Sequence, residues 1–116
     1  MKLLFAFFLI GLIPFPGDLS WNKTSHDFGN INNTDTLKTT FTCYNISNKE
    51  ITIENIQTSC GCVITKWQTT PIQPSDSSKI EVKFVPNKKK GSQFKSVSVY
   101  TTSGFYELEI KTNYTK

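Results

Sequence analysis

The sequence predicts an all-β protein, an antiparallel β-sandwich of about seven short strands. Three observations lead to this prediction. Short apolar runs alternate with polar residues, turn-forming residues recur about every ten positions, and no stretch shows sustained helical spacing. A chain of 116 residues has room for one domain with a modest core.

The first strand is expected over residues 21–28, ending at Gly29. A second strand is expected over residues 36–46. Within it Cys43 lies on the same face as Phe41, because alternate residues of a strand share a face, so its simplest interpretation is a core residue.

The clearest strand pattern covers residues 79–84. Ile80, Val82 and Phe84 alternate with charged residues, so we expect these three to face the core. The other strands are expected over residues 50–58, 63–67, 94–101 and 105–110.

The beginning of the chain is typical of a secretory signal peptide. Lys2 precedes an apolar run over residues 3–13 that ends at prolines. This run is shorter than the roughly 20 residues that a membrane span needs. We expect a signal peptide over residues 1–20, cleaved near its end, and one folded domain over residues 21–116. An uncleaved N-terminal anchor is the alternative, and the only case in which we expect a membrane contact.

The export signal and the three cysteines together predict the compartment. An exported protein folds in a periplasmic or extracellular space, where disulfides form. No cysteine directly follows the apolar run to accept a lipid, so we do not expect an outer-membrane lipoprotein. We therefore predict a periplasmic or secreted protein.

The charged residues argue against nucleic-acid binding. The net charge is +4, and every basic residue is a lysine. Without arginine the chain lacks the bidentate fork that recognises phosphate and guanine edges. The lysines are also spread along the chain, except in residues 88–90.

Two cysteines lie in the stretch Ser59-Cys60-Gly61-Cys62. In an extended strand their Cα atoms would be about 6.6 Å apart, at the upper edge of the range for a disulfide. A bridge would therefore need a bend at Gly61, which glycine permits through positive φ. Such a small loop would add little stability.

Three uses of these cysteines remain open. They can fill a tight bulge as small apolar side chains, or carry out thiol-redox chemistry with Cys43 as a third thiol. A soft-metal site is the third possibility, because Cys43, Cys60, Cys62 and His26 have the composition of a zinc site. The C-x-C spacing differs from the usual zinc knuckle, and we expect no bound metal.

No arrangement of residues points to catalysis. His26 is the only histidine, and we expect it to be structural, bonded to a neighbouring turn. The nine carboxylates are scattered, and neither a phosphate-binding glycine loop nor a nucleophile elbow is present. We therefore predict a protein that is not an enzyme, with no catalytic residues and no cofactor.

Several motifs in this order resemble the bacterial family DUF1573, a domain of unknown function. They cover essentially all of residues 21–112. The motifs are His26-Asp27-Phe28-Gly29, Phe41-Thr42-Cys43-Tyr44-Asn45, Ser59-Cys60-Gly61-Cys62, Trp67, Ile72-Gln73-Pro74, Ile80-Glu81-Val82-Lys83-Phe84, Pro86, Gly91 and Phe94.

The resemblance implies an immunoglobulin-like β-sandwich, similar to domains of periplasmic chaperones and of motile-sperm-protein-like modules. It also implies a secreted, periplasmic or lipid-anchored protein of Bacteroidetes-type bacteria, and it supplies no activity. The family-motif residues expected to have structural roles are His26, Asp27, Phe28, Gly29, Ser59, Gly61 and Trp67. Ser75 departs from the family pattern, which has glycine there, and suggests a different turn. Cys43 lies within one of the quoted segments but is not itself a residue of the family pattern.

One surface motif suggests a modification. Asp35-Thr36-Leu37 resembles the short acceptor that Bacteroidetes use for O-glycosylation, so Thr36 is a possible O-glycosylation site. Chance often supplies a three-residue pattern of this kind.

Three functions of different classes follow from these observations. We favour a non-enzymatic binding or assembly module at the cell envelope, which pairs with another envelope or secreted protein through an exposed strand edge. The second is a thiol-redox or soft-metal-binding protein that uses Cys60 and Cys62. The third is a secreted structural component that faces a host.

Overall fold

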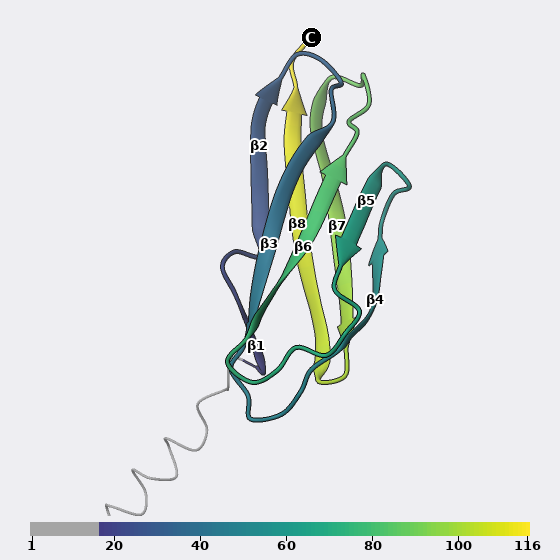
Figure 1. Cartoon of the computed structure of the whole chain (residues 1–116). Coiled ribbons are helices and arrows are strands. Elements are labelled where there is room, and N and C mark those ends of the chain that lie inside the picture. The colour runs from purple at the N-terminus through teal and green to yellow at the C-terminus, as the bar shows by residue number, and fades with distance from the viewer. Residues whose placement is uncertain (1–16) are drawn as a thin grey trace, which may run out of the picture.

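Eight strands form two facing sheets in the computed structural model, which describes residues 17–116 (Figure 1). The predicted all-β sandwich is confirmed. Within this part of the chain no helix is long and apolar enough to cross a membrane. The strands are β1 (Leu19–Trp21), β2 (Ser25–Ile31), β3 (Leu37–Asn45), β4 (Ile53–Thr58), β5 (Val63–Trp67), β6 (Ser77–Phe84), β7 (Gly91–Thr101) and β8 (Gly104–Tyr114).

Each sheet has four strands. The first sheet has the order β1-β3-β6-β5, and all its neighbours are antiparallel. The second sheet has the order β2-β8-β7-β4, in which β2 runs parallel to β8. Strands β1 and β2 are therefore edges on one long side of the sandwich, and β4 and β5 are edges on the other (Figure 1).

The core lies between the sheets and follows the alternation in the sequence. On β6 every second residue is buried, so that Ile80, Val82 and Phe84 face the core as predicted. Val97 and Val99 on β7 meet them from the second sheet. Burying each such side chain contributes about 1.5–3 kcal/mol, which makes the inward faces the main source of stability.

The single first strand expected over residues 21–28 is wrong. The chain leaves the first sheet after Trp21 and enters the second at Ser25, so this stretch divides between β1 and β2. Gly29 does not end the strand either. It has a φ of 79° inside β2, where the pairing with β8 shifts, and so it forms a bulge within a strand that continues to Ile31.

The folded domain begins before the expected boundary at Trp21. Leu19 is only 1% exposed and pairs with Asn45 of β3, so it belongs to the core. The apolar run on which the signal-peptide prediction rests lies within residues 1–16, outside the described residues.

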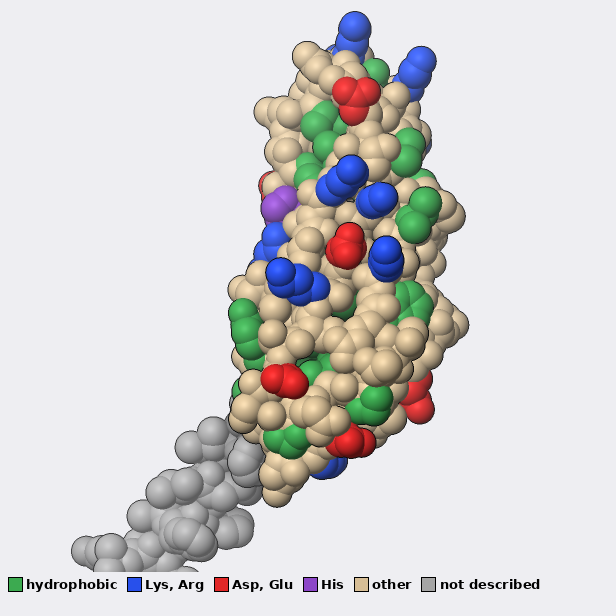
Figure 2. Space-filling view, in the orientation of Figure 1, with side chains coloured by type: hydrophobic (Ala, Val, Ile, Leu, Met, Phe, Trp, Pro, Cys, Tyr) green, Lys and Arg blue, Asp and Glu red, His purple; other side chains and the backbone are tan. Residues whose placement is uncertain are grey.

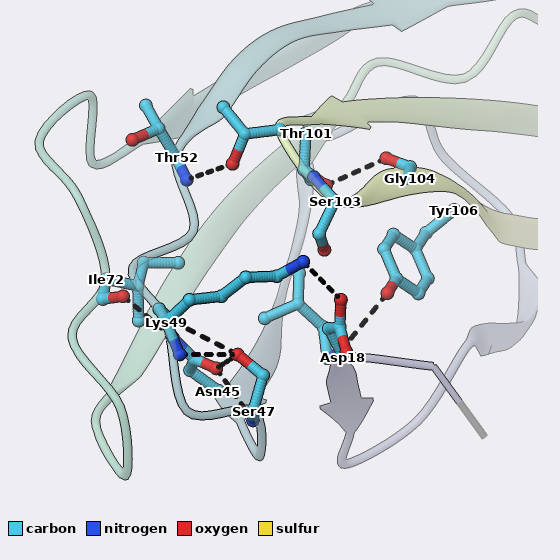
Figure 3. A network of polar contacts seen from close by, with 12 residues as sticks. Asp18, Asn45, Ser47, Lys49, Thr52, Ile72, Thr101, Ser103, Gly104 and Tyr106 are labelled. Carbon is cyan, nitrogen blue, oxygen red and sulfur yellow. Dashed lines mark hydrogen bonds and ion pairs between the residues drawn. The ribbon is translucent and has the colours of Figure 1, made fainter. Parts of the chain in front are cut away.

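A buried asparagine organises the base of the sandwich, next to β1 (Figure 3). The Asn45 amide donates to the carbonyls of Lys49 and Ile72, at 2.8 and 2.9 Å. Its oxygen accepts hydrogen bonds from the N–H and the hydroxyl of Ser47. Asp18 adds an ion pair to Lys49 at 3.5 Å. These bonds hold the β3–β4 connection against the rest of the base.

The start of β4 and the turn at Ser75, both near this base, differ from expectation. The strand expected from residue 50 begins only at Ile53, and Ile51 forms an isolated bridge to Ile72. Ser75 adopts a φ of 70°, the left-handed conformation that glycine favours. The serine is therefore accommodated in a glycine-like conformation.

Candidate functional site

Residues 59–62, which we call the disulfide crossover, carry the chain from β4 in the second sheet to β5 in the first. At its start the Ser59 N–H donates to the Ser96 carbonyl, and the Ser59 hydroxyl accepts from the Ser96 N–H, at 3.1 and 3.0 Å. At its end the Val85 N–H donates to the Cys62 carbonyl at 3.0 Å. The crossover thus continues the pairing of one sheet directly into the other.

Cys60 and Cys62 are joined by a disulfide, with a Cα–Cα distance of 5.1 Å. The chain bends between them, as a bridge of this spacing requires. The expected use of positive φ at Gly61 is wrong, because Gly61 is not among the residues with positive φ. A Cβ at this position would meet no atom within 4 Å, so local sterics do not require the glycine.

Local hydrogen bonds surround the bridge. The Cys60 carbonyl accepts from the Thr58 hydroxyl at 2.9 Å and from the Val63 N–H at 3.2 Å. The Cys62 N–H lies 3.1 Å from the Cys60 sulfur. These bonds and the disulfide fix the turn locally, in addition to its bonds to Ser96 and Val85.

Cys43 lies far from this corner. It pairs with Ser78 on β6, six residues from the position that pairs with Val63, and so lies about 20 Å away along the strand. Its side chain is fully buried, and its thiol donates to the Ser78 carbonyl at 3.6 Å. Burial raises the pKa of the Cys43 thiol, which keeps it protonated and unreactive. Cys43 is therefore not placed to serve as a third thiol.

The zinc-like composition is not assembled in space. Over residues 17–116 no three His, Cys, Asp or Glu side chains lie close enough together to hold a metal ion. His26 belongs to β2, at the opposite long side of the sandwich from Cys60 and Cys62.

The other long side is closed by residues 22–24, which we call the polar crossover. The Asn22 N–H donates to the Thr42 carbonyl at 3.0 Å, and the Asn22 side-chain oxygen accepts from the Thr42 N–H at 2.9 Å. The Thr24 carbonyl accepts from the Glu109 N–H at 2.9 Å. This crossover therefore bonds to strands of both sheets.

His26 is part of the structure around the polar crossover. The Lys23 ammonium lies 2.9 Å from His26 Nδ1 and donates to the Thr39 hydroxyl at 2.8 Å. Burial, and then the neighbouring Lys23 charge, lower the pKa of His26 below its usual 6.5, while Asp27 raises it in part. The neutral ring accepts from Lys23 and contacts Phe28 edge-on at 4.6 Å.

The remaining predicted residues lie apart from one another. Asp27 accepts from the Gly29 N–H at 2.8 Å and so supports the β2 bulge. Trp67, the last residue of β5, is half-buried, and its indole N–H finds no hydrogen-bond partner among the described residues. Thr36 is exposed in the β2–β3 connection.

The edge of β5 is the feature that sequence patterns did not reveal. Cys62 and Val85 form a hydrogen-bonded pair, so in this antiparallel ladder Ile64 and Lys66 also bond to β6. The N–H and C=O groups of Thr65 and Trp67 must then point away from β6, and they have no hydrogen-bond partner among residues 17–116. Together they offer a row of free backbone donors and acceptors.

The other edges offer less regular backbone. Strand β1 has only three residues, and the pairings of β2 and β4 both contain a register shift. Bulges and short length are features that prevent edge strands from pairing with another chain. Of the four edges in residues 17–116, β5 alone combines five residues with an unbroken register.

Lysines gather beside this edge, on the outer face of the first sheet (Figure 2). We call this surface the lysine face. Figure 2 shows the positive side chains around one carboxylate, over the middle of β3, β5 and β6. Its exposed charged residues are Lys38, Lys66, Lys79, Lys83 and Glu81.

Known structures share the fold. A protein of unknown function from Porphyromonas gingivalis W83 matches with a TM-score of 0.71 and 15% identity, over 84% of this chain and 46% of that one. The ASH/PapD-like domain 7 of human CEP192 matches with a TM-score of 0.65 and 9% identity, over 90% and 91%. The YadV chaperone matches with a TM-score of 0.60 and 12% identity, over 84% and 51%.

These likenesses show the fold alone, and they confirm the immunoglobulin-like sandwich. The chain spans only about half the length of the Porphyromonas protein and of the chaperone. A comparison with curated proteins found no match. A family model described as "Protein of unknown function (DUF1573)" matches residues 19–114, and the chain therefore belongs to this family, as its motifs predicted.

Proposed function

We propose that the protein is a non-enzymatic binding module, secreted or at the cell envelope, that takes an extended segment of another protein along the free edge of β5. The observation that carries this proposal is the outward-pointing backbone of Thr65 and Trp67 on an unbulged edge strand. Main-chain hydrogen bonds to such an edge provide affinity in strand addition.

Two further observations support strand addition at β5. The disulfide crossover holds the start of β5 by short local bonds, so the strand is fixed in place before a partner arrives. Ile64 on the same strand is 61% exposed, which leaves an apolar contact for a partner beside the backbone edge.

A photocrosslinking experiment tests the proposal in the producing cells. A photoreactive residue in place of Ile64 should give a discrete adduct with a partner protein. Thr65→Pro should abolish the adduct, because proline removes the outward N–H while leaving the β6 hydrogen bonds intact. Thr65→Val, which keeps the N–H, should retain it.

The opposite edge supplies the control position. A photoreactive residue in place of Asn30 on β2 should give no adduct, because the bulge at Gly29 interrupts that edge. An Ile64 adduct that survives Thr65→Pro in a folded protein would contradict strand addition.

The thiol-redox alternative would use the disulfide between Cys60 and Cys62. The same assay separates the two proposals. A Cys60→Ser/Cys62→Ser variant that still folds should keep the Ile64 adduct if β5 is the binding edge.

A further inference from the structure

Two lysines of the lysine face repel each other, which lowers the stability of the fold. Lys38 and Lys83 lie directly opposite each other on β3 and β6. Like charges in such a cross-strand pair are destabilising. The two ion pairs found within residues 17–116, Lys49–Asp18 and Lys111–Asp27, both lie elsewhere, so neither relieves this repulsion.

The lysine face also carries a net positive charge. It has four lysines against one glutamate, an excess of three in a chain whose net charge is +4. Glu81 lies opposite Lys66 and two residues from both Lys79 and Lys83, so the face has one carboxylate for four ammonium groups. The surface therefore retains an unneutralised positive potential.

This potential lies where an added strand would place its side chains. A partner residue bonded to Thr65 would point its own side chain toward the inner face, as Thr65 does. Its two neighbours would then lie on the lysine face, one beside Ile64 and one beside Lys66, at a cross-strand spacing of about 5 Å. Between β5 and β6 this face has a hollow of about 140 Å³, lined by Ile64, Thr65, Lys66, Glu81 and Lys83.

Lys66 also disfavours pairing of β5 with a second copy of itself. An antiparallel pair that bonds Thr65 of one copy to Trp67 of the other would place Lys66 opposite Lys66. A lysine on an edge strand is a common protection against such association. A partner with a negative charge at this position would instead be attracted by the same lysine.

We propose that the partner of β5 is an acidic extended segment, in which glutamate or aspartate side chains alternate with apolar or small residues. The acidic side chains lie on the lysine face, and the alternate residues face inward along the β5 edge. This inference rests on the proposed strand addition and specifies the chemistry of its partner.

Synthetic nine-residue peptides with capped ends test the charge preference. The first alternates valine with glutamate, and two others carry glutamine or lysine in place of glutamate. The glutamate peptide should bind the purified protein about tenfold more tightly than the glutamine peptide, and the lysine peptide more weakly than either. The preference should weaken at 0.5 M salt, because the contacts are exposed.

Two matched variants test whether the charge preference arises at the lysine face. Lys66→Glu should reverse the order of the glutamate and lysine peptides. Lys90→Glu makes the same change in net charge in the exposed β6–β7 connection and should leave the order unchanged. Equal effects of the two variants would contradict recognition at the lysine face.

A fourth peptide separates failure of this inference from failure of strand addition. It is the glutamate peptide with N-methylated valines, which cannot donate to the β5 edge, and it should not bind. If it binds as tightly as the parent, or if no peptide binds, strand addition itself is wrong. If the glutamine and lysine peptides bind as tightly as the glutamate peptide, strand addition stands and the acidic partner is wrong.

Binding of anionic phospholipid vesicles that is lost in Lys66→Glu, without peptide binding, would replace the peptide by a lipid surface and overturn the inference.

Discussion

The two long sides of the sandwich are closed in different ways. The polar crossover bonds to Thr42 and Glu109, which are about 20 and 85 residues away in the sequence and lie in different sheets. The disulfide crossover bonds to Ser96 of the second sheet and to Val85 next to β6, and it forms further bonds within its own turn, around Cys60. Both crossovers therefore bond to both sheets, but the disulfide crossover adds a covalent bridge and leads into β5, whose outer edge has no strand partner among residues 17–116.

The same comparison explains the positions of the family motif. His26, Asp27 and Gly29 build the polar side and its bulge, while Ser59 and Cys60 build the disulfide side. None of these residues needs a catalytic role to account for its contacts. These residues of the motif therefore lie at or next to the places where the chain changes sheets.

Replacing the side chain that anchors the end of β5 should have the largest effect on stability. Trp67→Ala should lower the free energy of unfolding by about 2 kcal/mol, less than the 3–5 kcal/mol of a fully buried tryptophan because Trp67 is half-buried. Trp67→Phe should cost less than about 1 kcal/mol, since the lost indole N–H has no partner in the described chain. Urea denaturation measures both. An equal loss in the two variants would show that the indole N–H contributes.

Removing the disulfide should have the next largest effect. For a loop of only three residues, chain entropy predicts a loss of about 1.6 kcal/mol in the Cys60→Ser/Cys62→Ser variant, which is less than the roughly 2–4 kcal/mol of a typical disulfide. A reducing agent should destabilise the natural protein equally and leave the variant unchanged. Alkylation of the folded, non-reduced protein should modify no cysteine, because Cys43 is buried. Rapid alkylation of Cys60 and Cys62 without reductant would contradict the bridge.

Weakening the polar crossover should cost about 1 kcal/mol. Asn22→Ala removes the acceptor of the Thr42 N–H at an exposed position, where water replaces part of the bond. Because the two crossovers share no contacts, this loss should add to that of the cysteine variant within about 0.5 kcal/mol. Denaturation of the combined variant measures the sum. Strong non-additivity would show that the two sides are coupled.

The smallest expected effect is a pH dependence confined to the polar side. The folded-state pKa of His26 lies below the unfolded value of 6.5, so the unfolded chain binds the proton more readily. The contribution of His26 is therefore fully present above about pH 6.5 and is lost as the pH falls toward the folded-state pKa. Measuring the free energy of unfolding of the natural protein and of His26→Gln between pH 5 and 8 isolates this contribution. A natural protein that gains stability relative to the variant on acidification would contradict this sign.

Local patterns predicted the inward faces but not the paths between the sheets. The alternation of Ile80, Val82 and Phe84 is a property of one strand, and it matches the structure. The division of residues 21–28 between two sheets depends on Asn22 bonding to Thr42, and a local pattern does not contain that contact. Gly29 predicted a strand end because a glycine signals a turn as readily as a bulge.

For the candidate site, too, local features could be predicted from the sequence, and contacts between distant residues could not. The bend at Cys60 and Cys62 could be predicted from their spacing, while the distance of Cys43 from them could not, because it depends on strand pairing. The charged side chains of Lys66 and Lys83 were visible in the sequence, but their place beside a free edge follows from the order of the sheet. Edge position is a property of the whole fold.

Amide hydrogen exchange of the free protein, resolved by residue, tests the central difference between the two sides most directly. The N–H groups of Ile64 and Lys66 should be protected by β6, and those of Thr65 and Trp67 should exchange at nearly unprotected rates. On the polar side, the Thr42 and Glu109 N–H groups should be protected by Asn22 and Thr24. Equal protection along β5, from residue 64 to residue 67, would show that its edge is already paired and would contradict the account.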